Sequence, residues 1–100
     1  MIKLTLIDDG FTIAGDRTGY VRWDEITQIS AYKVDLYTYD QVCIGIHTFK
    51  SANCIELQEE WDGYNLVVAE IERRFCIADG WWQKVAFPAF RENYMVLYAR

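Results

Sequence analysis

Histidine and cysteine are few in this sequence, and the only histidine lies on the same expected hairpin as two of the three cysteines. The chain has 100 residues with one histidine, His47, and three cysteines. Apolar residues alternate on both sides of a loop near residue 50, and burying both apolar sets on one face fixes the register of the two strands. That register places His47 opposite Cys54, and Gly45 opposite Glu56. Three metal-ligand types on one outer face are the minimum for a catalytic zinc site.

The rest of the sequence does not extend this triplet into an active site. A metal site needs supporting groups around its ligands, and a cysteine nucleophile needs a base with an orienting partner. The chain has no Gly-Xaa-Ser-Xaa-Gly motif, phosphate-binding loop or dinucleotide fingerprint. We therefore expect no catalytic residue, no cofactor and no resident metal. A small metal-binding enzyme using His47, Cys54 and Glu56 stays as an alternative.

An acidic run follows the hairpin and indicates a different kind of site. No Lys or Arg lies between Ser51 and Glu72, and the net charge of the chain is −5. Nucleic acids and anionic membranes attract clustered basic residues, so the charge argues against both as partners. Acidic runs are commonly solvated faces, and their functional interpretation here is a docking surface for a basic protein. The run consists of Glu56, Glu59, Glu60 and Asp62.

Large aromatic residues lie next to this run and later in the chain. Trp81 and Trp82 are adjacent, so in an extended chain they cannot point the same way, and one is expected to be exposed. An exposed tryptophan beside an acidic patch is typical of an interface anchor. It is equally typical of a homodimer seam. The predicted partner-binding residues are Glu56, Glu59, Glu60, Trp61, Asp62, Trp81 and Trp82.

The elements that position these residues are mainly strands of one domain over residues 1–100. Alternation predicts a three-stranded meander in the first quarter, with Asp9-Gly10 as its first hairpin turn. A tight helical turn is expected near Trp23, followed by a long strand from Ile29 to Tyr39. The hairpin described above follows, and residues 94–98 alternate well enough for a last short strand.

One amphipathic helix is expected after the acidic run. Asp62 is its expected N-cap. The segment from Trp81 to Phe90 shows no clean period, so this helix is expected to be the only one. The fold class is then mainly β (α+β), with an antiparallel sheet of about six to seven strands. The apolar face of the helix consists of Tyr64, Val67, Val68, Ile71 and Phe75.

The stretch Trp23–Lys33 contains a Trp-Xaa-Xaa-Ile-Xaa-Xaa-Ile pattern that leads into a strand. It resembles small bacterial pleckstrin-homology-like proteins, and the segments 59–64 and 85–90 are similar to such proteins as well. The resemblance implies a pleckstrin-homology-like sheet or partly open barrel with one C-terminal helix. Some of these proteins are proposed immunity proteins of polymorphic toxin systems. The resemblance supplies no catalytic or ligand residues, and the loops at 8–10 and 15–19, which together carry a net negative charge, argue against phosphoinositide binding.

The sequence also predicts where the protein is located and whether its cysteines are paired. No apolar run approaches the ~18 residues of a membrane span, and the N-terminus lacks a signal-peptide pattern. We expect a cytoplasmic protein with three buried free thiols. Its expected function is that of a non-catalytic, immunity-type module that docks a basic protein. The alternative from another class is a self-associating structural domain that forms a homo-oligomer through its aromatic C-terminal segment.

Overall fold

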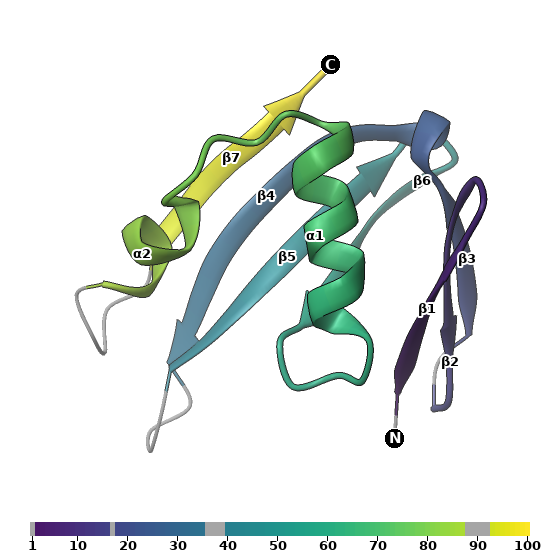
Figure 1. The fold of residues 1–100 in the computed structure, drawn as a ribbon, viewed down its shortest axis with the longest axis horizontal. Helices are drawn as coiled ribbons and strands as arrows, with labels where there is room; N and C mark the ends of the chain where they lie inside the picture. The colour runs from purple at the N-terminus through teal and green to yellow at the C-terminus, as the bar shows by residue number, and fades with distance from the viewer. Residues whose placement is uncertain (1, 17, 36–39, 88–92) are drawn as a thin grey trace.

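Two antiparallel sheets form the framework of the molecule (Figure 1). The computed structural model describes residues 2–16, 18–35, 40–87 and 93–100. A three-stranded sheet consists of β1 (Lys3–Ile7), β2 (Gly10–Ala14) and β3 (Gly19–Arg22), in that order. A four-stranded sheet has the order β6-β5-β4-β7, with β4 (Ile26–Asp35), β5 (Asp40–Thr48), β6 (Ser51–Gln58) and β7 (Asn93–Ala99). The described strands form no closed barrel, and the expected mainly β, antiparallel class is confirmed.

Two α-helices within the described residues cover one face of the four-stranded sheet. Figure 1 shows α1 (Tyr64–Arg74) lying across that face, with the three-stranded sheet on one side and α2 (Trp81–Ala86) on the other. The face toward the helices is the core: its apolar residues alternate along the strands with residues that point outward. The buried residues on this face include Ile29, Ala31, Ile44, Ile46 and Leu57, and α1 contributes Val67, Val68 and Ile71 to the same core.

The predicted register of the β5–β6 hairpin is confirmed where alternation is strongest. Ile44 pairs with Leu57, and Gly45 pairs with Glu56. The register shifts between Ile46 and Thr48, where we expected His47 to face Cys54. The regular part of the hairpin was predictable because a slip by one residue would expose a whole apolar set.

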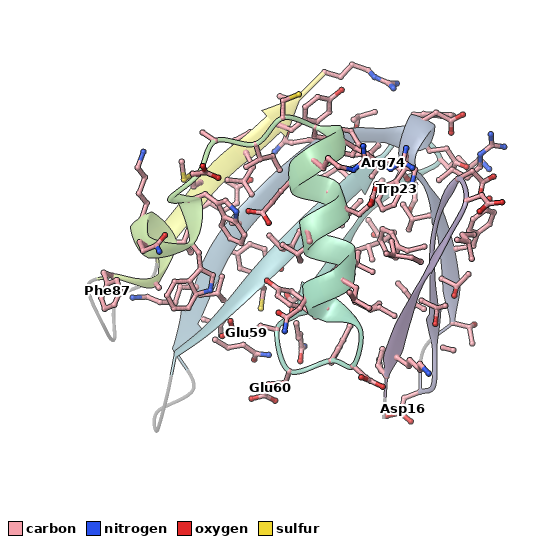
Figure 2. The ribbon with its side chains drawn as sticks, viewed as in Figure 1. Asp16, Trp23, Glu59, Glu60, Arg74 and Phe87 are labelled. Atoms are coloured by element: carbon pink, nitrogen blue, oxygen red, sulfur yellow. The ribbon has the colours of Figure 1, made fainter. Side chains whose placement is uncertain are left out.

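The turn at Trp23 is confirmed as a 3₁₀ turn, η1 (Trp23–Glu25), which joins the two sheets. The Trp23 ring packs against Phe11 with 5.6 Å between ring centroids. The guanidinium carbon of Arg74 lies over the same ring, 5.2 Å from its centroid. Figure 2 shows Arg74 at the end of α1, beside Trp23. Trp23 thus ties η1, β2 and α1 together through apolar and cation–π contacts.

The first hairpin turn lies one residue earlier than predicted. Ile7 pairs with Gly10, so Asp8 and Asp9 form the turn and Gly10 is the first residue of β2. A Cβ on Gly10 would lie 1.8 Å from the carbonyl oxygen of Val21. The glycine therefore allows a close approach of β3, a tertiary requirement that a turn motif does not reveal.

The start of α1 also differs from the prediction, because Gly63 and not Asp62 is its N-cap. Gly63 has φ 85°, and a Cβ there would lie 2.0 Å from the carbonyl oxygen of Leu4. The Asp62 backbone is used for sheet contact, since its carbonyl oxygen accepts a hydrogen bond from the Leu4 N–H at 2.7 Å. The predicted apolar face of the helix is confirmed, with Tyr64, Val67, Val68 and Ile71 buried and Phe75 packed against the core.

The expectation of a single helix is wrong, because residues 81–86 form α2. Six residues are too few to show a helical period in sequence. The structure stabilises this short helix by burying Trp81 and Val85. The expected last strand is confirmed as β7, whereas residues 36–39 and 88–90, on which other expectations fall, lie outside the described residues.

Candidate functional site

The two adjacent tryptophans point to different environments, as predicted. Trp81 is buried, and its indole Nε1–H donates a hydrogen bond to Glu72 Oε2 at 2.9 Å. Trp82 is 40% exposed. Because a buried tryptophan cannot reach a partner, the prediction that Trp81 belongs to the binding surface is wrong, and Trp81 fixes α2 to α1 instead.

Trp82 lies in a small cluster with one acidic and one aromatic residue, Glu59 and Phe87, which we call the Glu59–Trp82 cluster. The Trp82 Nε1–H donates to Glu59 Oε2 at 3.4 Å. The Phe87 ring stands at 82° to the Trp82 ring, with 6.4 Å between centroids, and Phe87 is 61% exposed. The cluster therefore presents apolar rings beside a carboxylate at the surface.

The structure holds the Glu59 carboxylate in place from the sheet side. Glu59 Oε1 accepts a hydrogen bond from the backbone N–H of Val42 at 3.1 Å. One carboxylate thus connects the start of β5 to α2, and Figure 2 shows it between the sheet and the loop that precedes α1. A side chain held at both oxygens loses little freedom when a partner binds.

Glu60 and Asp62 extend the acidic surface along the loop before α1. Both are exposed, and Figure 2 shows Glu60 at the outer end of this loop. They line a shallow depression of about 640 Å³ together with Lys3 and Leu66. Trp61 is half-buried and packs against the core, so it anchors the loop before α1 to the core. The structure therefore brings Glu59, Glu60 and Asp62 to one region, as predicted.

Glu56 does not belong to this surface, although the sequence places it in the same acidic run. It lies on the outer face of β6, where Glu56 Oε2 accepts a hydrogen bond from the Tyr32 hydroxyl at 2.5 Å. Its other oxygen accepts from Gln58 Nε2 at 3.1 Å. Burial, followed by this hydrogen bond, raises the pKa of Tyr32 above its ordinary value. Glu56 is a structural partner of Tyr32 on the outer face of the sheet, so its place in the predicted docking surface stays a prediction.

The outer face of the four-stranded sheet carries a hollow that sequence reasoning missed. It measures about 640 Å³, and the rings of Tyr32 and Tyr94 lie nearly parallel beside it with 6.4 Å between centroids. Tyr94 and Val96 are 61% and 47% exposed. The alternation of these residues with Met95 and Leu97 was the available signal. The described lining of the hollow is Ser30, Tyr32, Lys33, Val34, His47, Cys54 and Tyr94.

His47 and Cys54 share this hollow, but the surroundings do not make a reactive site. Burial and then the Glu56 charge raise the pKa of Cys54 above its ordinary value. Burial raises the pKa of Cys43 to about 12. Both thiols are therefore protonated at neutral pH, and a thiol attacks only as the thiolate. Among the described residues no three His, Cys, Asp or Glu side chains come together in a way that would hold a metal ion.

All three cysteines are free, as predicted, but only Cys43 is buried. Cys54 is exposed on the edge strand β6, and Cys76 is exposed in the turn after α1. The expectation of three buried thiols is wrong for these two, because apolar neighbours in sequence do not cover an edge strand or a loop.

No family model, no curated protein and no solved structure matches the chain. Within the part of the chain that the structure describes, no helix has the length and apolar character needed to cross a lipid bilayer.

Proposed function

We propose that this chain is a non-catalytic protein-binding module that docks a basic protein through the Glu59–Trp82 cluster and the adjacent Glu60 and Asp62. The observation that carries the proposal is the exposed Trp82 ring, which is hydrogen-bonded to Glu59 and packed against Phe87. Aromatic anchors dominate the binding energy of protein interfaces. A carboxylate beside the anchor selects for a basic group on the partner.

The distribution of charge supports a basic partner. The net charge is −5, and no Lys or Arg lies between Ser51 and Glu72. Trp82 reaches Glu59 of this segment from α2, 23 residues later in sequence. An acidic field of this kind speeds the encounter with a basic protein, and added salt screens it.

The narrower form of the proposal is an immunity-type protein of the pleckstrin-homology-like kind that occludes the active surface of a basic toxin. Its supports are the Trp23–Lys33 pattern, the mainly β architecture and the acidic cluster. A cytoplasmic location belongs to the same proposal. Three free cysteines support it, because thiols persist unpaired in reducing compartments.

Capture of partners from a lysate of the source cell on tagged protein tests this proposal. The baits are the unmodified chain, Trp82→Ala, Glu60→Lys and the control Asp8→Lys. Asp8 is an exposed acid in the β1–β2 turn, at the far end of β1 from Lys3, which is bridged to Asp62. The control therefore changes the net charge as much as Glu60→Lys does, but outside the docking surface.

We expect a basic polypeptide that high salt releases and that Asp8→Lys retains. Trp82→Ala and Glu60→Lys should both lose it. Equal recovery on all four baits would rule out the Glu59–Trp82 cluster as the docking surface. Recovery of the chain alone would contradict the basic-partner proposal and leave self-association as the alternative.

A further inference from the structure

Of the edge strands in the two sheets, β7 has a distinct chemistry. The four edges are β1, β3, β6 and β7. β1 carries Lys3, β3 carries Arg22 and β6 carries Glu56. β7 reads Asn-Tyr-Met-Val-Leu-Tyr-Ala, with no charged residue and no proline. Charges and prolines are common protections of an edge against pairing with another chain, and β7 has neither, although its pairing with β4 shifts register between Ile29 and Ser30.

The backbone of β7 is paired on one side. Its partner is β4, from Gln28↔Ala99 to Lys33↔Asn93. Among the described residues, those of β4 are the ones that form backbone hydrogen bonds with β7. The next residue, Arg100, is held on the β4 side, because its guanidinium Nη2 donates to the carbonyl oxygen of Asp24 at 3.1 Å. The charge of Arg100 therefore does not protect the free edge of β7 against pairing.

The outer face of this edge adds apolar surface to the free backbone groups. Tyr94 is 61% exposed and Val96 is 47% exposed, while α2 packs on the opposite face of the sheet (Figure 1). A strand added at this edge would cover both side chains and pair the open N–H and C=O groups. Main-chain pairing with side-chain burial is the usual basis of strand addition.

A second copy of the chain satisfies the geometry of this edge. Identical strands related by a two-fold axis perpendicular to the sheet run antiparallel, as all paired strands of this molecule do. The same axis keeps the outer faces together, so Tyr94 and Val96 of each copy would lie beside those of the other. The two sheets would then form one sheet of eight strands.

Charge favours a dimer at this edge over the others. Two chains of net charge −5 repel each other, but the acidic residues Glu59 and Glu60 follow β6, at the opposite edge of the sheet. Three strand spacings separate β6 from β7, roughly 14 Å at about 4.8 Å each. Pairing through β7 therefore keeps the two acidic regions apart, whereas pairing through β6 would bring them together.

We propose that the free edge of β7 is a homodimer interface, in which residues 93–99 of two copies pair antiparallel. This interface differs from the aromatic segment 81–90 considered from sequence, and it does not depend on the Glu59–Trp82 cluster. A single strand pair is a small interface, so the dimer is reversible and its population rises with concentration.

Sedimentation velocity over a concentration series tests the proposal with the unmodified chain, Val96→Lys and Phe49→Lys. Val96→Lys brings a charge into each half of the interface. Phe49→Lys makes the same kind of change at a 64% exposed residue after β5, a strand that does not pair with β7. We expect a monomer–dimer equilibrium for the unmodified chain and Phe49→Lys that persists at high salt. Val96→Lys should weaken the dimer by at least about tenfold.

Amide hydrogen exchange on the unmodified chain tests the same interface without a variant, so it applies even if Val96→Lys does not fold. Protection of the amides in 93–99 should rise with protein concentration, while that of the β6 amides stays constant. A monomer at every concentration would overturn the proposal, even if another protein were found to bind this edge. A dimer that Val96→Lys leaves intact, or a rise in protection confined to β6, would overturn it as well.

Discussion

At the scale of single residues, the glutamates of this chain have different hydrogen-bond partners, and the residues next to them in sequence do not predict which. Glu56 accepts from the Tyr32 hydroxyl, Glu59 from a backbone N–H and an indole, and Glu72 from the Trp81 indole. Glu60 is exposed at the outer end of its loop. Hydrogen-bonded carboxylates hold the fold together, so only part of the acidic run is available to the proposed docking surface.

Two glycines with the same backbone conformation provide a matched test of the α1 entry. Gly63 and Gly80 have φ of 85° and 88°. A Cβ at Gly80 meets nothing within 4 Å, so Gly80→Ala should cost only the left-handed conformation, about 1 kcal/mol. Gly63→Ala adds the clash with Leu4 and should cost at least about 3 kcal/mol in the free energy of unfolding.

Urea unfolding of both variants measures these costs. Equal losses would show that the approach of the Leu4 backbone to Gly63 does not constrain the start of α1.

The buried thiol of Cys43 predicts an alkaline loss of stability. Its pKa is about 12 in the folded chain and 9.0 in its ordinary state. Above pH 9 the unfolded chain therefore binds fewer protons than the folded chain, so the stability contributed by Cys43 is full below pH 9 and declines between pH 9 and 12.

Unfolding free energies measured across this range should fall less steeply for Cys43→Ala than for the unmodified chain. Cys76→Ala, a change at an exposed cysteine, is the control and should follow the unmodified chain. Parallel curves for all three proteins would contradict the assigned burial of Cys43.

At the scale of elements, α2 is a helix that depends on tertiary contacts and that the sequence pattern does not predict. The Trp81–Glu72 hydrogen bond connects it to α1, and Trp81 and Val85 are buried. The same six residues expose Trp82 to the Glu59–Trp82 cluster. The helix therefore couples a core residue to a surface residue one position away.

The two adjacent tryptophans should differ in their effect on stability. Trp81→Ala removes a buried ring and should cost about 3–5 kcal/mol. Trp82→Ala changes an exposed side chain and should stay within about 1 kcal/mol. Chemical unfolding followed by circular dichroism separates the two, and a loss for Trp82→Ala as large as that for Trp81→Ala would remove Trp82 from the candidate site.

Sequence predicted those elements whose pattern is repeated along a strand or helix. The Ile44↔Leu57 pairing and the Val67–Val68–Ile71 face follow from alternation and helical spacing, because burial acts on every residue of the pattern. It did not predict Gly10, Gly63 or α2, because each depends on a segment distant in sequence. Of the residues in the proposed docking surface, Glu59, Glu60 and Trp82 were candidates from sequence, whereas Phe87, which packs beside Trp82, was not among the predicted binding residues.

At the scale of the whole molecule, the two proposed interfaces use different residues, although α2, which carries Trp82, packs on β7. The acidic residues lie on the loop between β6 and α1, whereas the uncharged edge β7 closes the other side of the four-stranded sheet. The dependence of binding on salt concentration distinguishes the two proposed interfaces experimentally. Screening should weaken docking at the acidic surface and leave the strand-paired dimer in place.

The most direct test of the docking surface is the association rate of the captured partner as a function of ionic strength. Surface plasmon resonance with the unmodified chain, Glu60→Lys and Asp8→Lys provides it. We predict a rate that falls with salt, a loss of about tenfold for Glu60→Lys at low salt, and a near-normal rate for Asp8→Lys. A rate independent of salt, or equal loss in both variants, would contradict an acidic docking surface at Glu59, Glu60 and Trp82.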